Sequence, residues 1–239
     1  MKLKQTIAVA AILASIGFVE TLRASVLNGG FESGNVQEWR LNIPRASNMS
    51  GGSPRLTGNA TVTSHWSAPN NPSTLRSALE GSYFTVLGSS QELRLSGGRA
   101  FNISLTQRIH LRAGERISGA AGFYGQSGST RDSAWVNVLD GDGISLASPW
   151  RSPSSMSGST LTGWNDWSWQ ATADGDYYVG LGLTTYCSET SPSYGFFDDI
   201  LVHPATSITP VPEPSAMGLT AVAVAVMAAL RKKRNDFWP

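Results

Sequence analysis

Two acidic residues near opposite ends of the chain could together bind a metal ion. Glu32 follows the glycine-rich segment 27–31, and Asp198 lies in an apolar segment with Ile200. If Ile200 faces a core, the two-residue period of a strand places Asp198 on the same face and Asp199 outward, and a buried carboxylate needs a partner. Carboxylates and the carbonyls of a glycine-rich turn suit Ca²⁺, which prefers oxygen ligands. We expect a structural calcium ion at Glu32 and Asp198. The alternative is that Asp198 accepts backbone N–H groups or pairs with an arginine, without a metal.

Residues for zinc or nucleophilic chemistry form no recognisable pattern. His65, His110 and His203 are far apart and fit no His-Glu-x-x-His spacing. The sequence has no Gly-x-Ser-x-Gly elbow, phosphate-binding loop or dinucleotide-binding fingerprint. Cys187 is the only cysteine, which excludes an intrachain disulfide, and it has no evident catalytic partners. We therefore expect a protein that is not an enzyme and has no catalytic residues.

The tryptophans suggest a different chemistry, the stacking of an aromatic ring on a sugar ring. Carbohydrate sites combine exposed Trp or Tyr rings with a few polar groups. Trp135 alternates with Val136 and Val138, so these valines are expected in the core and Trp135 on the opposite, solvent-facing side. Trp167 and Trp169 share one strand face and are expected to fill the core. Trp135 is therefore the predicted ligand-binding residue.

Short strands must position these residues. Apolar and polar residues alternate in several segments, and Asp140-Gly141 favours a hairpin turn. A further strand carries Trp167 and Trp169. The other expected strands are 36–41, 60–66, 77–87, 92–95, 103–111, 115–124, 134–139, 177–183 and 194–203. The sequence predicts an all-β fold over residues 25–205, a jelly-roll β-sandwich of about ten antiparallel strands.

The two ends of the chain read as targeting segments flanking this domain. Lys2 and Lys4 precede an uncharged, mostly apolar segment, so residues 1–24 are expected to be a signal peptide with a short helix. Residues 206–215 form a linker that ends in a stiff Pro-Glu-Pro motif, and 216–234 form a hydrophobic helix with a basic stop. The motif residues are Val211, Pro212, Glu213 and Pro214, and the basic residues are Arg231, Lys232, Lys233 and Arg234.

This tail closely resembles the PEP-CTERM sorting signal of Gram-negative bacteria. The resemblance implies export by the Sec machinery and processing by an exosortase-type enzyme that recognises the Pro-Glu-Pro segment. It also implies transient anchoring in the inner membrane through the C-terminal helix, with the C-terminus cytoplasmic. The final location would be the cell surface or the extracellular space.

The body has a second resemblance. The run Leu27-Asn28-Gly29-Gly30-Phe31-Glu32, the later Trp39 and the closing Phe196-Phe197-Asp198-Asp199-Ile200 look like carbohydrate-binding-module jelly rolls. The run at 113–123 is similar to the common body of PEP-CTERM proteins. The resemblance spans residues 25–203. It implies that Glu32 and an aspartate of the last strand help to hold structural calcium.

Charge excludes one class of partner. Residues 25–210 carry 11 arginines, no lysine and 14 acidic residues, unlike the basic surface of a nucleic-acid-binding protein. We expect a non-enzymatic, exosortase-sorted protein of the envelope or extracellular matrix. One alternative is a carbohydrate-binding module for exopolysaccharide, and a second is a hydrolase of the matrix polysaccharide. Exposed aromatics would favour the binding module, and a cleft with paired acids would favour the hydrolase.

Overall fold

The computed structural model describes residues 25–43, 45–46, 55–56, 58–69, 71–89, 100–125, 131–153, 160–186 and 192–205. The chain divides into two compact units, Met1–Ala205 and Thr206–Pro239, and every described residue belongs to the first. The expected signal peptide, the strand at 92–95, Cys187, the Pro-Glu-Pro motif, the C-terminal helix and its basic stop lie outside the described residues. Within the described ranges, no helix is long and apolar enough to cross a membrane.

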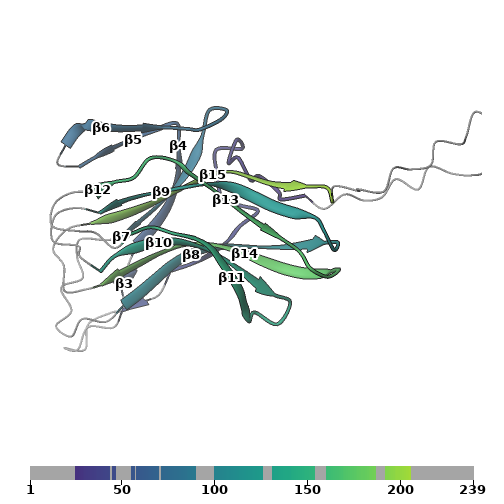
Figure 1. The fold of residues 1–239 in the computed structure, drawn as a ribbon. Coiled ribbons are helices and arrows are strands. Elements are labelled where there is room, and N and C mark those ends of the chain that lie inside the picture. The colour runs from purple at the N-terminus through teal and green to yellow at the C-terminus, as the bar shows by residue number, and fades with distance from the viewer. Residues whose placement is uncertain are drawn as a thin grey trace, which may run out of the picture. The chain divides into compact units, whose positions relative to one another are not determined.

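Two antiparallel sheets form the body of the first unit (Figure 1). The five-stranded sheet has the order β1 (Arg40–Asn42), β8 (Ala100–Leu111), β14 (Gly175–Tyr186), β10 (Ser133–Asp140) and β11 (Ser145–Arg151). The six-stranded sheet has the order β12 (Thr160–Leu161), β9 (Arg116–Gly125), β15 (Ser193–His203), β7 (Phe84–Ser89) and β4 (Gly58–Thr63), and β13 (Asn165–Gln170) also pairs with β9. Small two-stranded sheets join β2 (Arg45–Ala46) to β3 (Arg55–Leu56) and β5 (His65–Ala68) to β6 (Asn71–Ser77).

The chain crosses repeatedly between the two sheets. Strands β7 to β10 alternate between them, and β13 to β15 do so again. No parallel pair occurs among the described strands. The predicted all-β jelly-roll sandwich is therefore confirmed.

The core lies between the inner faces of the two sheets. On the five-stranded sheet it takes alternate residues, including Leu105 of β8, Val136 of β10 and Leu181 of β14. On the six-stranded sheet it includes Phe123 of β9 and Phe197 of β15. Burying each side chain of this size stabilises the fold by about 1.5–3 kcal/mol. Because alternate residues of each strand fill the core, the residues between them point to the outer face, where a ligand could bind.

The β5–β6 hairpin lies over the outer face of the six-stranded sheet (Figure 1). A second apolar cluster joins the hairpin to this face. Trp66 of the hairpin contacts the rings of Tyr124, Tyr194 and Phe196, with centroid separations of 5.2, 4.9 and 4.8 Å. Arg76 of β6 lies 4.6 Å from the ring centres of both Trp164 and Phe196. The aromatic side chains on this side are therefore largely committed to packing.

Two expected strands differ from those observed. The segment 77–87 is interrupted, because β6 ends at Ser77 and residues 78–83 form a loop before β7 begins at Phe84. Gly81 has a φ of 63° there, which a strand does not allow. At 36–41, a backbone hydrogen bond from Trp39 N to Val36 O closes a turn, and pairing starts only at Arg40.

Candidate functional site

Trp135 lies on the outer face of the five-stranded sheet, as its alternation predicts. Its neighbours Ala134 and Val136 are fully buried in the core, and Val138 is 1 % exposed. Trp135 is partly exposed and pairs directly with Arg151 of β11 and Gly182 of β14. Residues directly opposite each other in an antiparallel pair share a face. The outer face around Trp135 therefore includes both of these neighbours.

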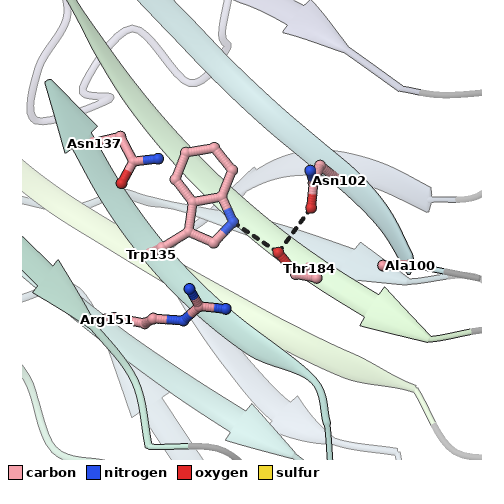
Figure 2. Close-up of a pocket in the computed structure, with 6 residues that line it drawn as sticks. All are labelled: Ala100, Asn102, Trp135, Asn137, Arg151 and Thr184. Carbon is pink, nitrogen blue, oxygen red and sulfur yellow. Dashed lines mark hydrogen bonds between the residues drawn. The ribbon is translucent and has the colours of Figure 1, made fainter. Parts of the chain in front are cut away.

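Two glycines of β14 make room for the indole ring. A Cβ atom on Gly182 would lie 2.1 Å from Cζ2 of Trp135, so the ring occupies the space of the missing side chain. A Cβ atom on Gly180 would lie 3.5 Å from Cζ3, at ordinary contact distance. The ring lies over the backbone of β14, and Figure 2 shows its broad side from outside the sheet.

A chain of hydrogen bonds fixes the orientation of the indole. Nε1 of Trp135 donates to Oγ1 of Thr184 at 2.9 Å, and this hydroxyl donates to Oδ1 of Asn102 at 2.7 Å (Figure 2). Because the three residues come from adjacent strands, β10, β14 and β8, the rigid sheet holds the ring in place before any ligand arrives.

The ring and its neighbours line an open pocket of about 380 Å³. The lining residues are Ala100, Asn102, Trp135, Asn137, Arg151 and Thr184 (Figure 2). They combine one flat apolar surface with two amides, a hydroxyl and a guanidinium. Such a set can stack on an apolar ring face while donating and accepting hydrogen bonds around it.

The same outer face continues along β8 and β14 with further polar side chains. Arg108 donates from Nη2 to Oδ2 of Asp176 at 2.7 Å, and Nδ1 of His110 lies 3.2 Å from Oδ1. The hydrogen bond from Arg108, followed by that from His110, lowers the pKa of Asp176. The hydrogen bond to Asp176 likewise raises the pKa of Arg108. Arg108 and Asp176 therefore remain charged on the surface at neutral pH.

Other tryptophans of the domain are placed differently from Trp135. Trp167 is 4 % exposed and belongs to the core, which confirms its expected role as packing. Trp169 and Trp150 are partly buried against the same core. Trp164 packs on the outer aromatic cluster, where its ring meets Phe84 at 5.7 Å.

Glu32 and Asp198 hold the same loop. Oε1 of Glu32 accepts hydrogen bonds from the backbone N–H groups of Ser82 and Tyr83, both at 2.9 Å. Oδ2 of Asp198 accepts from Leu79 N at 2.8 Å, and Oδ1 accepts from Asp199 N at 2.9 Å. Of the alternatives open for Asp198, the structure shows acceptance of backbone N–H groups.

The expected position of Asp198 on the core face is wrong, because β15 contains a bulge. Its register with β9 shifts between Asp198 and Leu201, and Asp199 has a φ of 53°. Phe197 and Ile200 both point into the core, so strict alternation from Phe197 puts Asp198 on the outer face, under the 78–83 loop. Asp199 is partly exposed. Asp198 itself is only 1 % exposed, so it is buried but outside the core.

The fit of calcium to these carboxylates is mixed. The segment of Glu32 does lie beside the last strand, because Ile200 N donates to Gly29 O at 3.1 Å. Burial raises the pKa of Asp198 to about 6, so a nearby cation would stabilise its charged form. However, backbone N–H groups already occupy three oxygens of the two carboxylates, and the described residues contain no group of three or more His, Cys, Asp or Glu side chains that could hold a metal. Calcium therefore stays a prediction.

A second pocket, of about 420 Å³, lies on the outer face of the six-stranded sheet. Its lining includes Asp166, Asp199, Ser118 and His203. Oγ of Ser118 and Nε2 of His203 are 2.6 Å apart. Burial, followed by the nearby charge of Glu80, raises the pKa of Asp199. These groups form a polar pocket without an exposed aromatic platform.

Comparison with known proteins gives only remote similarities. No family model matches the sequence, and no curated protein matches it. Similar solved structures include TmCBM61 in complex with beta-1,4-galactotriose (17 % identity, 76 % of this chain, 98 % of that chain, TM-score 0.42). They also include the Family 16 Carbohydrate Binding Module-2 (16 %, 75 % and 99 %, TM-score 0.35) and the Stig cyclase Fisc from Fischerella sp. TAU (16 %, 75 % and 96 %, TM-score 0.41). With TM-scores below 0.5, these similarities carry no argument about function.

Sequence reasoning found the aromatic centre of the pocket but missed its surroundings. Asn102, Asn137, Arg151 and Thr184 come from four strands, and nothing in their local sequence marks them. One signal was available, the Gly180-x-Gly182 pair inside a strand pattern. Glycine in a strand interior often marks a site where another group approaches the backbone closely.

Proposed function

We propose that this protein is a non-enzymatic, exported carbohydrate-binding protein, whose jelly-roll domain binds polysaccharide on the outer face of the five-stranded sheet. One observation carries the proposal. The indole of Trp135 lies over Gly182 with a fixed orientation, and its outward side faces an open pocket lined with amide, hydroxyl and guanidinium groups.

The chemistry of this platform suits a sugar ring. A pyranose has apolar C–H faces that stack on an aromatic ring, and hydroxyl groups around its edge. The side chains of Asn102, Asn137 and Arg151 offer donors and acceptors at the rim of the pocket. Because the sheet pre-orients the indole, binding orders few side chains and loses little conformational entropy.

The two ends of the sequence support an extracellular role. A signal peptide at 1–24 and a sorting signal at 211–234 would deliver the domain to the outer side of the inner membrane. An exosortase-type enzyme would then process the tail. The polymer within reach at that location is the extracellular polysaccharide, and we propose it as the partner.

Substitution of Trp135 tests the binding function. In affinity electrophoresis of the purified full chain through gels containing the host's own exopolysaccharide, the native protein should be retarded. Trp135→Ala should weaken binding by roughly 30-fold or more, because hot-spot aromatics contribute about 2 kcal/mol or more. The melting temperature should change little, since Trp135 lies outside the core.

Tyr83→Ala is the matched control, because Tyr83 is 38 % exposed in the loop before β7, away from the pocket. This variant should bind like the native protein. If the native chain shows no retardation, the domain is a structural component of the envelope or matrix without a glycan ligand. Normal binding by Trp135→Ala would remove Trp135 from the site but not exclude another glycan surface.

A further inference from the structure

The strand register places three arginines on the outer face that carries Trp135. Arg151 of β11 lies directly opposite Trp135, and Arg40 of β1 lies directly opposite Thr106 of β8. Arg108 follows two residues later on the same face of β8. All three arginines are exposed.

Within the described strands of the five-stranded sheet, a single carboxylate opposes these charges on the outer face. Asp176 of β14 forms an ion pair with Arg108, and its other carboxylate oxygen lies 3.2 Å from Nδ1 of His110. Arg151 donates to a neutral partner, Oγ of Ser133, at 3.1 Å. The face is therefore positive, although acidic residues outnumber arginines in residues 25–210 as a whole.

Arg40 and Arg151, which are not part of the ion pair with Asp176, lie at opposite edges of the sheet. β1 and β11 are its edge strands, with β8, β14 and β10 between them. At about 4.8 Å per strand, Arg40 and Arg151 are separated by roughly 19 Å across the sheet. A glycan chain that crosses the strands would pass over the Trp135 platform and meet a guanidinium at each edge.

On this basis, and resting on the proposed function, we infer that the polysaccharide bound on this face is acidic. Its anionic groups, carboxylate or sulfate, pair with Arg151 and Arg40 while a sugar ring stacks on Trp135. A guanidinium matches either group through two parallel hydrogen bonds. A neutral glycan would leave both positive charges without a partner, so this face discriminates by charge as well as by ring stacking.

Defined polysaccharides test this inference on the purified full chain. The probes for affinity electrophoresis are alginate, polygalacturonate, their carboxyl-reduced neutral forms, dextran sulfate and neutral dextran. We expect retardation by at least one acidic polymer, and none by neutral dextran. Whether the uronates or dextran sulfate retard the protein tells carboxylate recognition from sulfate recognition. Added NaCl should weaken binding, since salt screens exposed charges.

Charge variants identify the residues responsible. Arg151→Gln and Arg40→Gln should each weaken binding about fivefold, the upper end for an exposed ion pair. Asp176→Asn should strengthen binding, because it releases Arg108 from its ion pair. Arg116→Gln is the matched control, since Arg116 is an exposed arginine on the other sheet.

The outcomes separate this inference from the proposed function. Equal binding to a uronate and its carboxyl-reduced form, lost in Trp135→Ala, would overturn the acidic ligand but keep the binding function. If Arg116→Gln weakened binding as much as Arg151→Gln, and Trp135→Ala bound normally, the binding would be nonspecific electrostatic attraction. That result would overturn the inference. Absence of binding to every probe and to the host's exopolysaccharide would overturn both.

Discussion

At the scale of single residues, Asp198 carries a buried carboxyl group, and burial makes its ionisation less favourable. Its carboxyl is 1 % exposed, and its hydrogen bonds come from backbone N–H groups rather than from an arginine. Burial raises its pKa to about 6, and backbone N–H groups, Leu79 first, only partly offset this effect. Ionisation of Asp198 therefore costs more free energy in the folded protein than in the unfolded chain, and a bound cation would offset that cost.

This carboxyl should make stability depend on pH when metal is removed. Folded Asp198 holds its proton more tightly than the unfolded chain, where the pKa has its ordinary value near 3.8. Its stabilising contribution is fully present below that value and is lost as pH rises through about 6. In EDTA, the melting temperature should fall between pH 4 and pH 7, and Asp198→Asn should flatten that part of the profile.

Calcium would change the same measurement at neutral pH. An ion that binds the folded state alone stabilises by about 2.7 kcal/mol at a hundredfold excess over Kd. If Glu32 and Asp198 share calcium, EDTA should lower the melting temperature at pH 7.5, and Asp198→Asn should remove most of this sensitivity. A melt unaffected by EDTA, with no bound ion by elemental analysis, would show that backbone N–H groups alone hold these carboxylates.

At the scale of elements, strand β14 contributes to the site through glycines that leave space for the ring of Trp135. Gly180 and Gly182 alternate with the core residues Val179, Leu181 and Leu183, so one strand completes the core on one face and seats an indole on the other. Of these two glycines, only Gly182 is needed to accommodate the ring, because a Cβ atom there would collide with it and one on Gly180 would not.

Gly182→Ala should therefore impair binding almost as strongly as Trp135→Ala. The new methyl group would lie 2.1–2.4 Å from three ring atoms, so the indole must leave its place over β14. Replacing glycine by alanine also lowers the conformational entropy of the unfolded chain, which stabilises the folded state. The melting temperature should therefore change little. Gly180→Ala is the matched control, since its methyl would sit at 3.5 Å from the ring. Equal glycan affinity of the Gly182 variant and the native protein would contradict the seating of Trp135.

At the scale of the whole molecule, we propose separate tasks for the β-sandwich and the C-terminal tail. The boundary between the two compact units falls after Ala205, just before the linker that leads to the Pro-Glu-Pro motif. If the tail is a sorting signal, an enzyme could cleave it without disturbing the core of the sandwich. The tail should therefore control release, and the sandwich should control binding.

Replacing Pro212-Glu213-Pro214 by three alanines should leave export across the inner membrane intact and block processing of the tail. The protein should then accumulate in the membrane fraction of a host that has an exosortase, because the variant keeps the apolar segment 216–230 and the basic residues after it, which are expected to anchor it. Fractionation with immunoblotting measures this, and Ser215→Ala, just beyond the motif, is the control. Unchanged release of the triple variant would refute the sorting signal.

How much could be predicted depended on whether a feature is local or assembled. Alternation along single strands determined the sandwich, the core valines around Trp135 and the outward direction of that ring, because side chains of a strand point to opposite faces every second residue. The two terminal segments interpreted as targeting signals are also contiguous, so this interpretation required no knowledge of the fold. The tertiary structure decided what lies beside what. Strand register set Gly182 under the indole and Arg151 and Arg40 on the same face, and a one-residue bulge at Asp199 turned Asp198 away from the core. Register and bulges arise from pairing between distant segments, and no local period encodes them.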